Sequence, residues 1–162
     1  MPIRPAVAAD RDRLAVILTG TERFTEREIG WAMELVDAAL LSRSDEYEVH
    51  VAVDGDEADA AVSGFVLFGP TPMTDDVYDL YWIAVDRARQ GRGVGQALLR
   101  FVEDTLRARG ARMLLIETSS NPGYAASVRF YQAAGYREIS RIKDFYRIED
   151  DKLVFSRTLK VP

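Results

Sequence analysis

The sequence predicts an α/β domain built on a mixed, mostly antiparallel sheet of about seven strands, flanked by about four helices. Three observations lead to this prediction. The chain has 162 residues, the length of one domain. Hydrophobic residues make up 48% and charged residues 29%, the balance of a globular protein with its own core. Segments with strand-like apolar patterns are interspersed with segments whose apolar residues recur at helical spacing. We therefore expect residues 1–162 to form a single domain.

The first half predicts a strand, two helices and then three strands. Residues 3–7 form the opening strand. Asp10 is placed to cap a helix that ends near Thr19, and Thr25 opens a second helix with apolar residues through Leu40 on one face. The strands follow at residues 48–53, 61–68 and 77–85. A turn at residues 54–56 and a break at residues 69–72 separate them.

The second half alternates more regularly. Residues 93–109 form an amphipathic helix with Gly110 at its stop position. The apolar run 113–116 indicates a strand that is buried on both faces. A helix over residues 124–134 closes at Gly135. Two final strands, 136–143 and 153–159, are joined by an acidic turn at residues 149–151.

Composition excludes several classes of function. There are no cysteines, so disulfides, thiolate nucleophiles and Cys-ligated metals are excluded, and a single histidine leaves almost nothing from which to build a His-based triad or a multi-His metal site. The net charge of −5 argues against binding nucleic acid as a whole. No secretory signal or membrane-spanning run is seen, so we expect a cytoplasmic protein. His50, on an alternating strand, is predicted to be a surface or edge residue without chemistry.

Residues 82–99 contain the pattern that indicates chemistry: a strand, a basic loop, glycines at 91, 93 and 95, and a helix. Glycines allow the backbone to approach a ligand closely, and the first N–H groups of a helix point at an anion. Residues 86–100 hold four arginines and one aspartate, which predicts a polyanion such as a pyrophosphate. The spacing fits neither a Walker A loop nor a Rossmann turn. The arginines argue against an ordinary turn before a surface helix.

These residues resemble a known family. The hexapeptide Gln90-Gly91-Arg92-Gly93-Val94-Gly95 fits the Gln/Arg-x-x-Gly-x-Gly/Ala motif of the GNAT superfamily of N-acetyltransferases. A second signature, a strand followed by a helix with an aromatic-Tyr pair and a Gly-aromatic end, is similar to residues 117–136. The order of strands and helices fits along the whole chain, so the resemblance also implies a GNAT-like fold.

The resemblance implies acetyl-CoA as the acyl donor and no metal. In similar proteins the loop binds the pyrophosphate, which here implicates Gln90, Gly91, Arg92, Gly93, Val94, Gly95 and Gln96. The preceding strand pairs with the pantetheine arm and polarises the thioester carbonyl, which implicates Ile83, Ala84 and Val85.

Two residues match catalytic positions of the family. Tyr131 matches the general acid that protonates the leaving thiolate, with a core aromatic as the alternative. Glu117 matches a carboxylate that some members use as general base, with a solvent-exposed rim carboxylate as the alternative. Many members have an asparagine seven residues before the tyrosine, where this chain has Tyr124. Asn121 lies three residues earlier, so both are candidates for the pantetheine contact, and Asn121 is alternatively a turn residue.

The resemblance implies an acetyltransferase that acts on a primary amine by direct attack in a ternary complex. We expect a small-molecule acceptor, and a protein amine is the other option; similar proteins often form homodimers. The alternatives are a CoA-binding sensor without turnover and a transferase of longer acyl groups. The helices within residues 10–42 and the loop before Val77 are expected to flank the acceptor. Candidate contacts there are Phe24, Glu28, Trp31, Tyr78, Trp82, Asp144, Phe145 and Tyr146.

Overall fold

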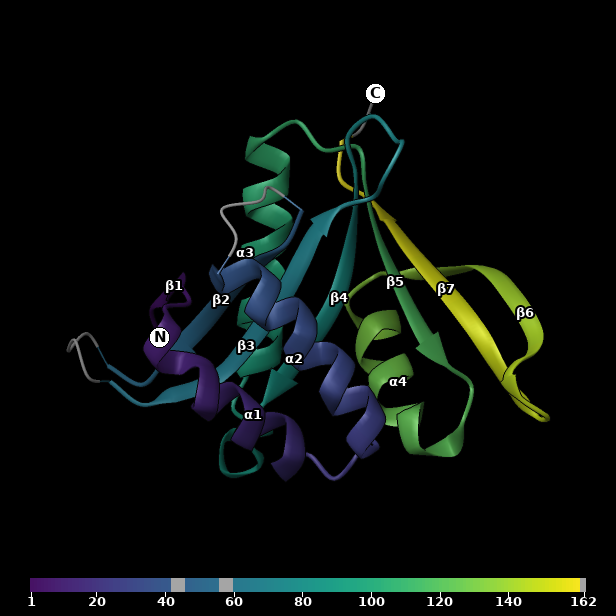
Figure 1. Cartoon of the computed structure of the whole chain (residues 1–162). Helices are drawn as coiled ribbons and strands as arrows, with labels where there is room; N and C mark the ends of the chain where they lie inside the picture. Colours follow the sequence, from purple (N-terminus) through teal and green to yellow (C-terminus); the bar gives the residue numbers. More distant parts are fainter. Residues whose placement is uncertain (42–45, 56–59, 161–162) are drawn as a thin grey trace.

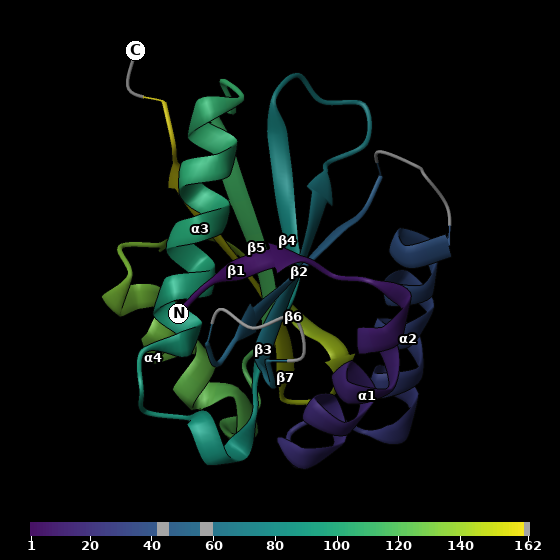
Figure 2. The same cartoon turned by 90° about the vertical axis from the view of Figure 1, so that its left-hand side faces the viewer.

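The computed structural model describes residues 1–41, 46–55 and 60–160 and confirms the predicted fold class. A seven-stranded sheet has the order β1-β2-β3-β4-β5-β7-β6 (Figure 1). All neighbouring strands pair antiparallel except β4 and β5, which are parallel. Helices α1 and α2 cover one face of the sheet, and α3 and α4 cover the other (Figure 2).

The elements follow the predicted order along the chain. Their bounds are β1 Ile3–Pro5, α1 Arg11–Gly20, α2 Glu26–Leu41, β2 Glu48–Val53, β3 Val62–Pro70, β4 Val77–Val85, α3 Val94–Ala108, β5 Met113–Ser119, α4 Ala125–Ala133, β6 Arg137–Arg147 and β7 Asp150–Thr158. Short 3-10 turns, η1 to η3, cover Ala8–Asp10, Arg87–Arg89 and Pro122–Tyr124.

Several predicted boundaries are wrong, among them the end of β1, which is Pro5 and not residue 7, and the end of β6, which is Arg147 and not residue 143. Strand β3 continues through Pro70, since a proline that ends a strand costs no hydrogen bond inside the ladder. Strand β5 continues past its apolar run to Ser119 because β7 pairs with it along its full length. The last turn consists of residues 148 and 149, and the two aspartates that follow already belong to β7. Asp56 of the predicted turn and Ser42 lie outside the described residues.

The two predicted helix starts differ in outcome. Thr25, predicted to open the second helix, caps α2: its hydroxyl accepts from the Glu28 N–H (3.2 Å), and the Glu28 carboxylate accepts from the Thr25 N–H (2.7 Å). Asp10 makes no side-chain cap on α1. Its carboxylate instead binds the Arg4 guanidinium (2.7 and 2.9 Å) and the Val7 N–H (2.8 Å). Arg4 of β1 therefore binds the Asp10 carboxylate, which the sequence had predicted to cap the helix.

The prediction for His50 is wrong. Strand β2 lies between β1 and β3, so His50 is not on an edge strand. Its ring lies 5.8 Å from that of Phe68 and 4.8 Å from that of Phe101, measured between centroids. Its Nδ1 is buried without a hydrogen-bond partner in the described part of the chain. Burial lowers the pKa of His50, more than the nearby charges change it.

Candidate active site

Strands β4 and β5 separate partway along the sheet, and this opening positions the site (Figure 1). Their parallel pairing ends at Leu80 and Ile116, although both strands continue. On the other side of β4, Leu67 pairs with Trp82 and Phe68 pairs with Leu80, so Tyr81 forms a bulge. A bulge bends its strand and increases the local twist. The bulge at Tyr81 therefore accounts for β4 leaving β5 at this point.

The end of β4 has backbone groups that no strand pairs. The Asp86 N–H donates to Ser63 O of β3 (2.9 Å). In an antiparallel pair, the N–H groups of successive residues point alternately toward the partner strand and away from it. The amide of Ala84 therefore faces β3, whereas the amides of Ile83 and Val85 face the opening. The Val85 carbonyl on this side accepts from the Gln90 side chain (3.3 Å).

The loop after β4 presents the N-terminus of α3 to the same opening. Gly91 (φ +74°) and Gly93 (φ +81°) adopt the left-handed conformation that glycine enters without strain. Gly93 occupies the N-cap position and supplies no side-chain cap. The first intrahelical bond, from the Ala97 N–H to Gly93 O, leaves the preceding amides of α3 without a backbone partner. They are free to bind an anion.

A cavity of about 410 Å³ joins these features. Most residues predicted to bind the cofactor line it, namely Ile83, Ala84, Val85, Gln90, Gly91, Gly93, Val94, Gly95 and Gln96. The other walls come from the α1–α2 loop, the 3-10 turn and α4, through Thr21, Arg23, Phe24, Arg89, Ala126, Ser127, Phe130 and Tyr131. Among the predicted contacts, Arg92, Asn121 and Tyr124 do not line the cavity.

The basic loop is less positive than the sequence suggests. Arg87 pairs with Glu22 (2.6 Å), and Arg89 pairs with Asp54 (2.6 Å). Arg92 and Arg100 form no ion pair with any residue in the described ranges. Arg23 adds a positive charge from the opposite wall, because it lines the cavity. The unpaired cations near the site thus come from two segments, the glycine loop and the α1–α2 loop. The sequence identified only those of the glycine loop.

Tyr131 lies in the wall of the cavity with its ring in the core. Its side chain is 7% exposed, and its ring contacts those of Phe130, Tyr136 and Phe155. The Tyr131 hydroxyl forms no hydrogen bond within the described residues. It is nevertheless not fully buried: among these residues, the one fully buried polar side-chain atom without a partner is His50 Nδ1. Desolvation raises the pKa of Tyr131 above its ordinary value. The phenol therefore keeps its proton at neutral pH.

Glu117 lies on β5, one residue beyond the last pair with β4. Its side chain is 51% exposed and forms an ion pair with Lys152 of β7 (2.7 Å). On β4, the Asp79 carboxylate is bound by the Thr71 hydroxyl (2.7 Å), and burial raises the pKa of Asp79. The negative charge of Glu117 adds to this increase in the pKa of Asp79. Glu117 does not line the cavity.

The turn before α4 places its two candidates differently. The Asn121 side chain accepts from the Gly123 N–H (2.9 Å) and so caps the turn. The Tyr124 hydroxyl donates to Glu28 Oε1 (2.9 Å). Tyr124 therefore joins α4 to the start of α2, a contact between residues 96 positions apart that the sequence did not indicate.

The acceptor candidates are dispersed. Phe24 lines the cavity and contacts the rings of Trp82 and Tyr124, at 6.1 and 6.3 Å between centroids. Tyr78 packs against the core under α3 and α4, on the opposite face from Phe24. Trp31 is 51% exposed and lies under the guanidinium of Arg27 (4.8 Å).

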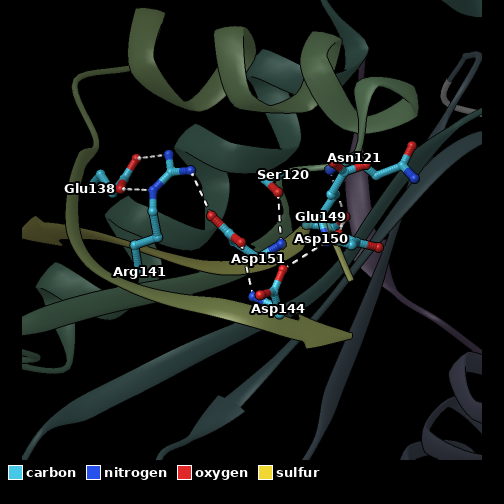
Figure 3. A network of polar contacts seen from close by, with 9 residues as sticks. Ser120, Asn121, Glu138, Arg141, Asp144, Glu149, Asp150 and Asp151 are labelled. Atoms are coloured by element: carbon cyan, nitrogen blue, oxygen red, sulfur yellow. Dashed lines mark hydrogen bonds and ion pairs between the residues drawn. The ribbon is translucent and has the colours of Figure 1, made fainter. Parts of the chain in front are cut away.

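The hairpin of β6 and β7 carries the remaining acceptor candidates on a bulge of β6. Ile142 pairs with Lys152 and Arg147 with Asp150, so residues 143–146 face only one residue of β7. The bulge is tied down by Asp151, which accepts from the Asp144 N–H (3.0 Å) and donates its own N–H to the Ser120 hydroxyl (2.8 Å) (Figure 3). These bonds fix the hairpin to the turn after β5.

Sequence reasoning missed the contribution of the α1–α2 loop to the cavity, through Thr21 and Arg23. These residues lie more than 60 positions before the glycine loop and carry no motif. Within the described ranges, no group of three or more potential metal ligands gathers. No described helix is long and apolar enough to span a membrane.

Comparisons with known proteins agree with this geometry. The model of the Acetyltransferase (GNAT) family matches residues 18–136, which include the opened strands, the glycine loop and α4. The crystal structure of a Desulfovibrio desulfuricans protein assigned to that family is 38% identical and has a TM-score of 0.89. It covers 98% of this chain and 99% of its own. An aminoglycoside 6'-N-acetyltransferase complexed with coenzyme A shares the fold, with 17% sequence identity and a TM-score of 0.75. The match covers 100% of this chain and 99% of that enzyme.

A curated relative from Escherichia coli K12 is the [ribosomal protein bS18]-alanine N-acetyltransferase. It is 32% identical over 85 residues, 52% of this chain and 56% of that enzyme. The chain thus spans about half the length of the curated relatives it matches.

Proposed function

The chain belongs to the Acetyltransferase (GNAT) family, and from this premise we propose that it transfers the acetyl group of acetyl-CoA to a primary amine by direct attack in a ternary complex. The observation that carries the proposal is the cavity in which the free amides of β4, the uncapped start of α3 and Tyr131 meet. The chain has no cysteine to carry an acetyl group, which favours direct transfer.

The residues present fit acetyl-CoA. A pyrophosphate would lie against the first amides of α3, next to Gly91 and Gly93, with Arg92 and Arg23 as nearby cations. The pantetheine arm would pair with the free backbone groups of Ile83 and Val85. A pantetheine contact from Asn121 would use its Nδ2, because Oδ1 accepts from the Gly123 N–H, and one from Tyr124 would share the hydroxyl that donates to Glu28.

When bound, acetyl-CoA supplies an acetyl group activated as a thioester. The exposed N–H of Ile83 or Val85 donates to the carbonyl oxygen as negative charge develops on it. The C–N bond forms as the C–S bond breaks. Tyr131 gives its proton to the departing sulfur, and Glu117, or water held beside it, takes the proton from the acceptor nitrogen. Because the pKa of Tyr131 is raised, the residue is protonated and ready to donate at neutral pH.

For the acceptor we propose a small-molecule amine first. A second candidate is the α-amine of a protein, supported by the similarity to the E. coli enzyme, whose name describes acetylation of a ribosomal-protein alanine. A panel of small amines and alanyl peptides separates the two.

The first test is calorimetric titration of the protein with acetyl-CoA, CoA and NADH. We expect both CoA species to bind and NADH not to bind. Gly93→Asp should abolish binding by placing a carboxylate at the anion site. Gly93→Asn has the same size and tolerates the left-handed conformation equally well, so it should retain most of the affinity. No binding of any CoA species would overturn the proposal.

Turnover is tested separately by thiol release from acetyl-CoA across the amine panel. Binding without thiol release would favour the alternative of a CoA-binding sensor. Faster release from longer acyl-CoA donors would identify a different acyl group.

A further inference from the structure

One carboxylate beside the cavity is held in place by three hydrogen bonds. Glu28 Oε2 accepts from the N–H and the hydroxyl of Thr25 (2.7 and 2.8 Å), and Oε1 accepts from the Tyr124 hydroxyl (2.9 Å). The bonds come from the first turn of α2 and from the turn before α4. Glu28 is thereby fixed where the acceptor side of the protein meets the donor side.

The Glu28 carboxylate accepts fewer hydrogen bonds than a carboxylate can. A carboxylate has about four acceptor positions, and the three bonds leave one, on Oε1. Arg147 lies close enough to influence Glu28 electrostatically, but its guanidinium pairs with Asp150 (3.3 Å). Burial raises the pKa of Glu28, and the bonds from Thr25 and Tyr124 outweigh it, so the pKa lies below its ordinary value. Glu28 is therefore a fixed anion and a poor proton acceptor.

Aromatic rings connect this anion to the cavity. Phe24 lines the cavity, and its ring contacts those of Trp82 and Tyr124. Tyr124 donates to Glu28, so the rings and the carboxylate form one surface. Ring faces attract cations, and a carboxylate with a free acceptor position binds an ammonium N–H.

Charges of both signs surround this surface. Burial raises the pKa of Tyr146, and the charges of Glu117, Asp150 and Glu28 raise it further. Lys152 and Arg147 lie near these carboxylates, and each is paired, with Glu117 and Asp150. Arg23, which lines the cavity beside Phe24, donates to Ser127 Oγ (3.5 Å) and forms no ion pair within the described residues. Of these three carboxylates, Glu28 is the one without an ion pair within the described residues.

We propose that the acceptor carries a second cationic group, which binds Glu28 beside the rings of Phe24, Trp82 and Tyr124 while the primary amine is acetylated. This inference rests on the proposed function and names its substrate class, a small diamine or polyamine. Glu28 selects the acceptor and takes no part in proton transfer.

The test compares acetylation of putrescine with that of butylamine, which has the same carbon chain and one amine. We expect kcat/KM for putrescine to be about tenfold higher or more, the factor that one hydrogen bond between charged groups supplies. Glu28→Gln keeps the cap, because glutamine also serves at this position of a capping box, but removes the charge. It should raise the KM for putrescine and bring the ratio near one. Glu26→Gln, two residues earlier and exposed, is the matched control and should keep the wild-type ratio.

The outcomes separate the two proposals. If wild type acetylates both amines equally well, or if Glu28→Gln keeps the preference, the inference is wrong and acetyl transfer still stands. If calorimetry shows no acetyl-CoA binding, the proposed function fails and the inference fails with it. A preference for an alanyl-arginine peptide over putrescine would overturn the small-molecule class.

Discussion

Two neighbouring tyrosines allow a sharp test of the catalytic assignment, because the same substitution should have opposite effects at each. The rings of Tyr131 and Tyr136 lie 6.1 Å apart between centroids, and both side chains are buried. The Tyr136 hydroxyl donates to Glu103 Oε1 (2.9 Å), whereas the Tyr131 hydroxyl has no partner among the residues described. Replacing either by phenylalanine removes one oxygen and keeps the ring.

The expected magnitudes follow from these contacts. Tyr131→Phe breaks no hydrogen bond, so the free energy of unfolding should change by less than about 0.5 kcal/mol. If Tyr131 is the general acid, kcat should fall by about 10² to 10⁴. Tyr136→Phe removes a hydrogen bond to a charged group, which costs about 1.5–3 kcal/mol. For a chain of this size the Tm should then fall by roughly 3–12 °C, with kcat nearly unchanged.

The assay pairs urea unfolding with thiol release at saturating acetyl-CoA and amine. Because the pKa of Tyr131 is raised above its ordinary value, the kcat of the wild type should show no alkaline decline from this residue below about pH 10. The reasoning is refuted if Tyr131→Phe turns over within about threefold of wild type. It is equally refuted if the two variants lose activity together, because the effect would then come from packing of the aromatic cluster.

Two further predictions concern stability. Burial lowers the pKa of His50 below 6.5, so the unfolded chain gains a proton before the folded chain does as the pH falls through 6.5. Urea unfolding should therefore show a free energy of unfolding that decreases from pH 6.5 downward, and His50→Phe should remove this decrease. An unchanged pH dependence in the variant would contradict the assignment. A Cβ on Gly64 would lie 2.9 Å from Ala84 O and 3.1 Å from Val94 Cγ1. Gly64→Ala should therefore cost about 1–3 kcal/mol and weaken acetyl-CoA binding, because Ala84 and Val94 line the cavity. Gly30→Ala is the control: a Cβ on Gly30, in an exposed part of α2, would have no atom within 4 Å. This variant should increase the free energy of unfolding by about 0.5–1 kcal/mol. Equal effects of the two substitutions would refute the steric argument.

Local patterns were sufficient wherever a residue's role depends on its neighbours in the chain. Apolar patterns and turn residues identified the strands and α-helices of the described residues. The glycine loop located the start of α3, because a left-handed glycine before a helix is a property of a few consecutive residues. Thr25 was recognised as the start of α2 for the same reason. Errors arose at element ends, where strand pairing decides the length, as for β5.

Long-range contacts decided the rest. Asp10 binds Arg4 of β1 rather than capping its helix, and His50 lies between Phe68 and Phe101, because the sheet order places β2 inside. The sequence by itself determined the family, the fold class and the position of the glycine loop before α3, because their patterns lie in residues adjacent in the chain. Only the tertiary structure decided that Tyr124 binds Glu28. That contact joins two elements on opposite sides of the opened strands, and no local pattern encodes their approach.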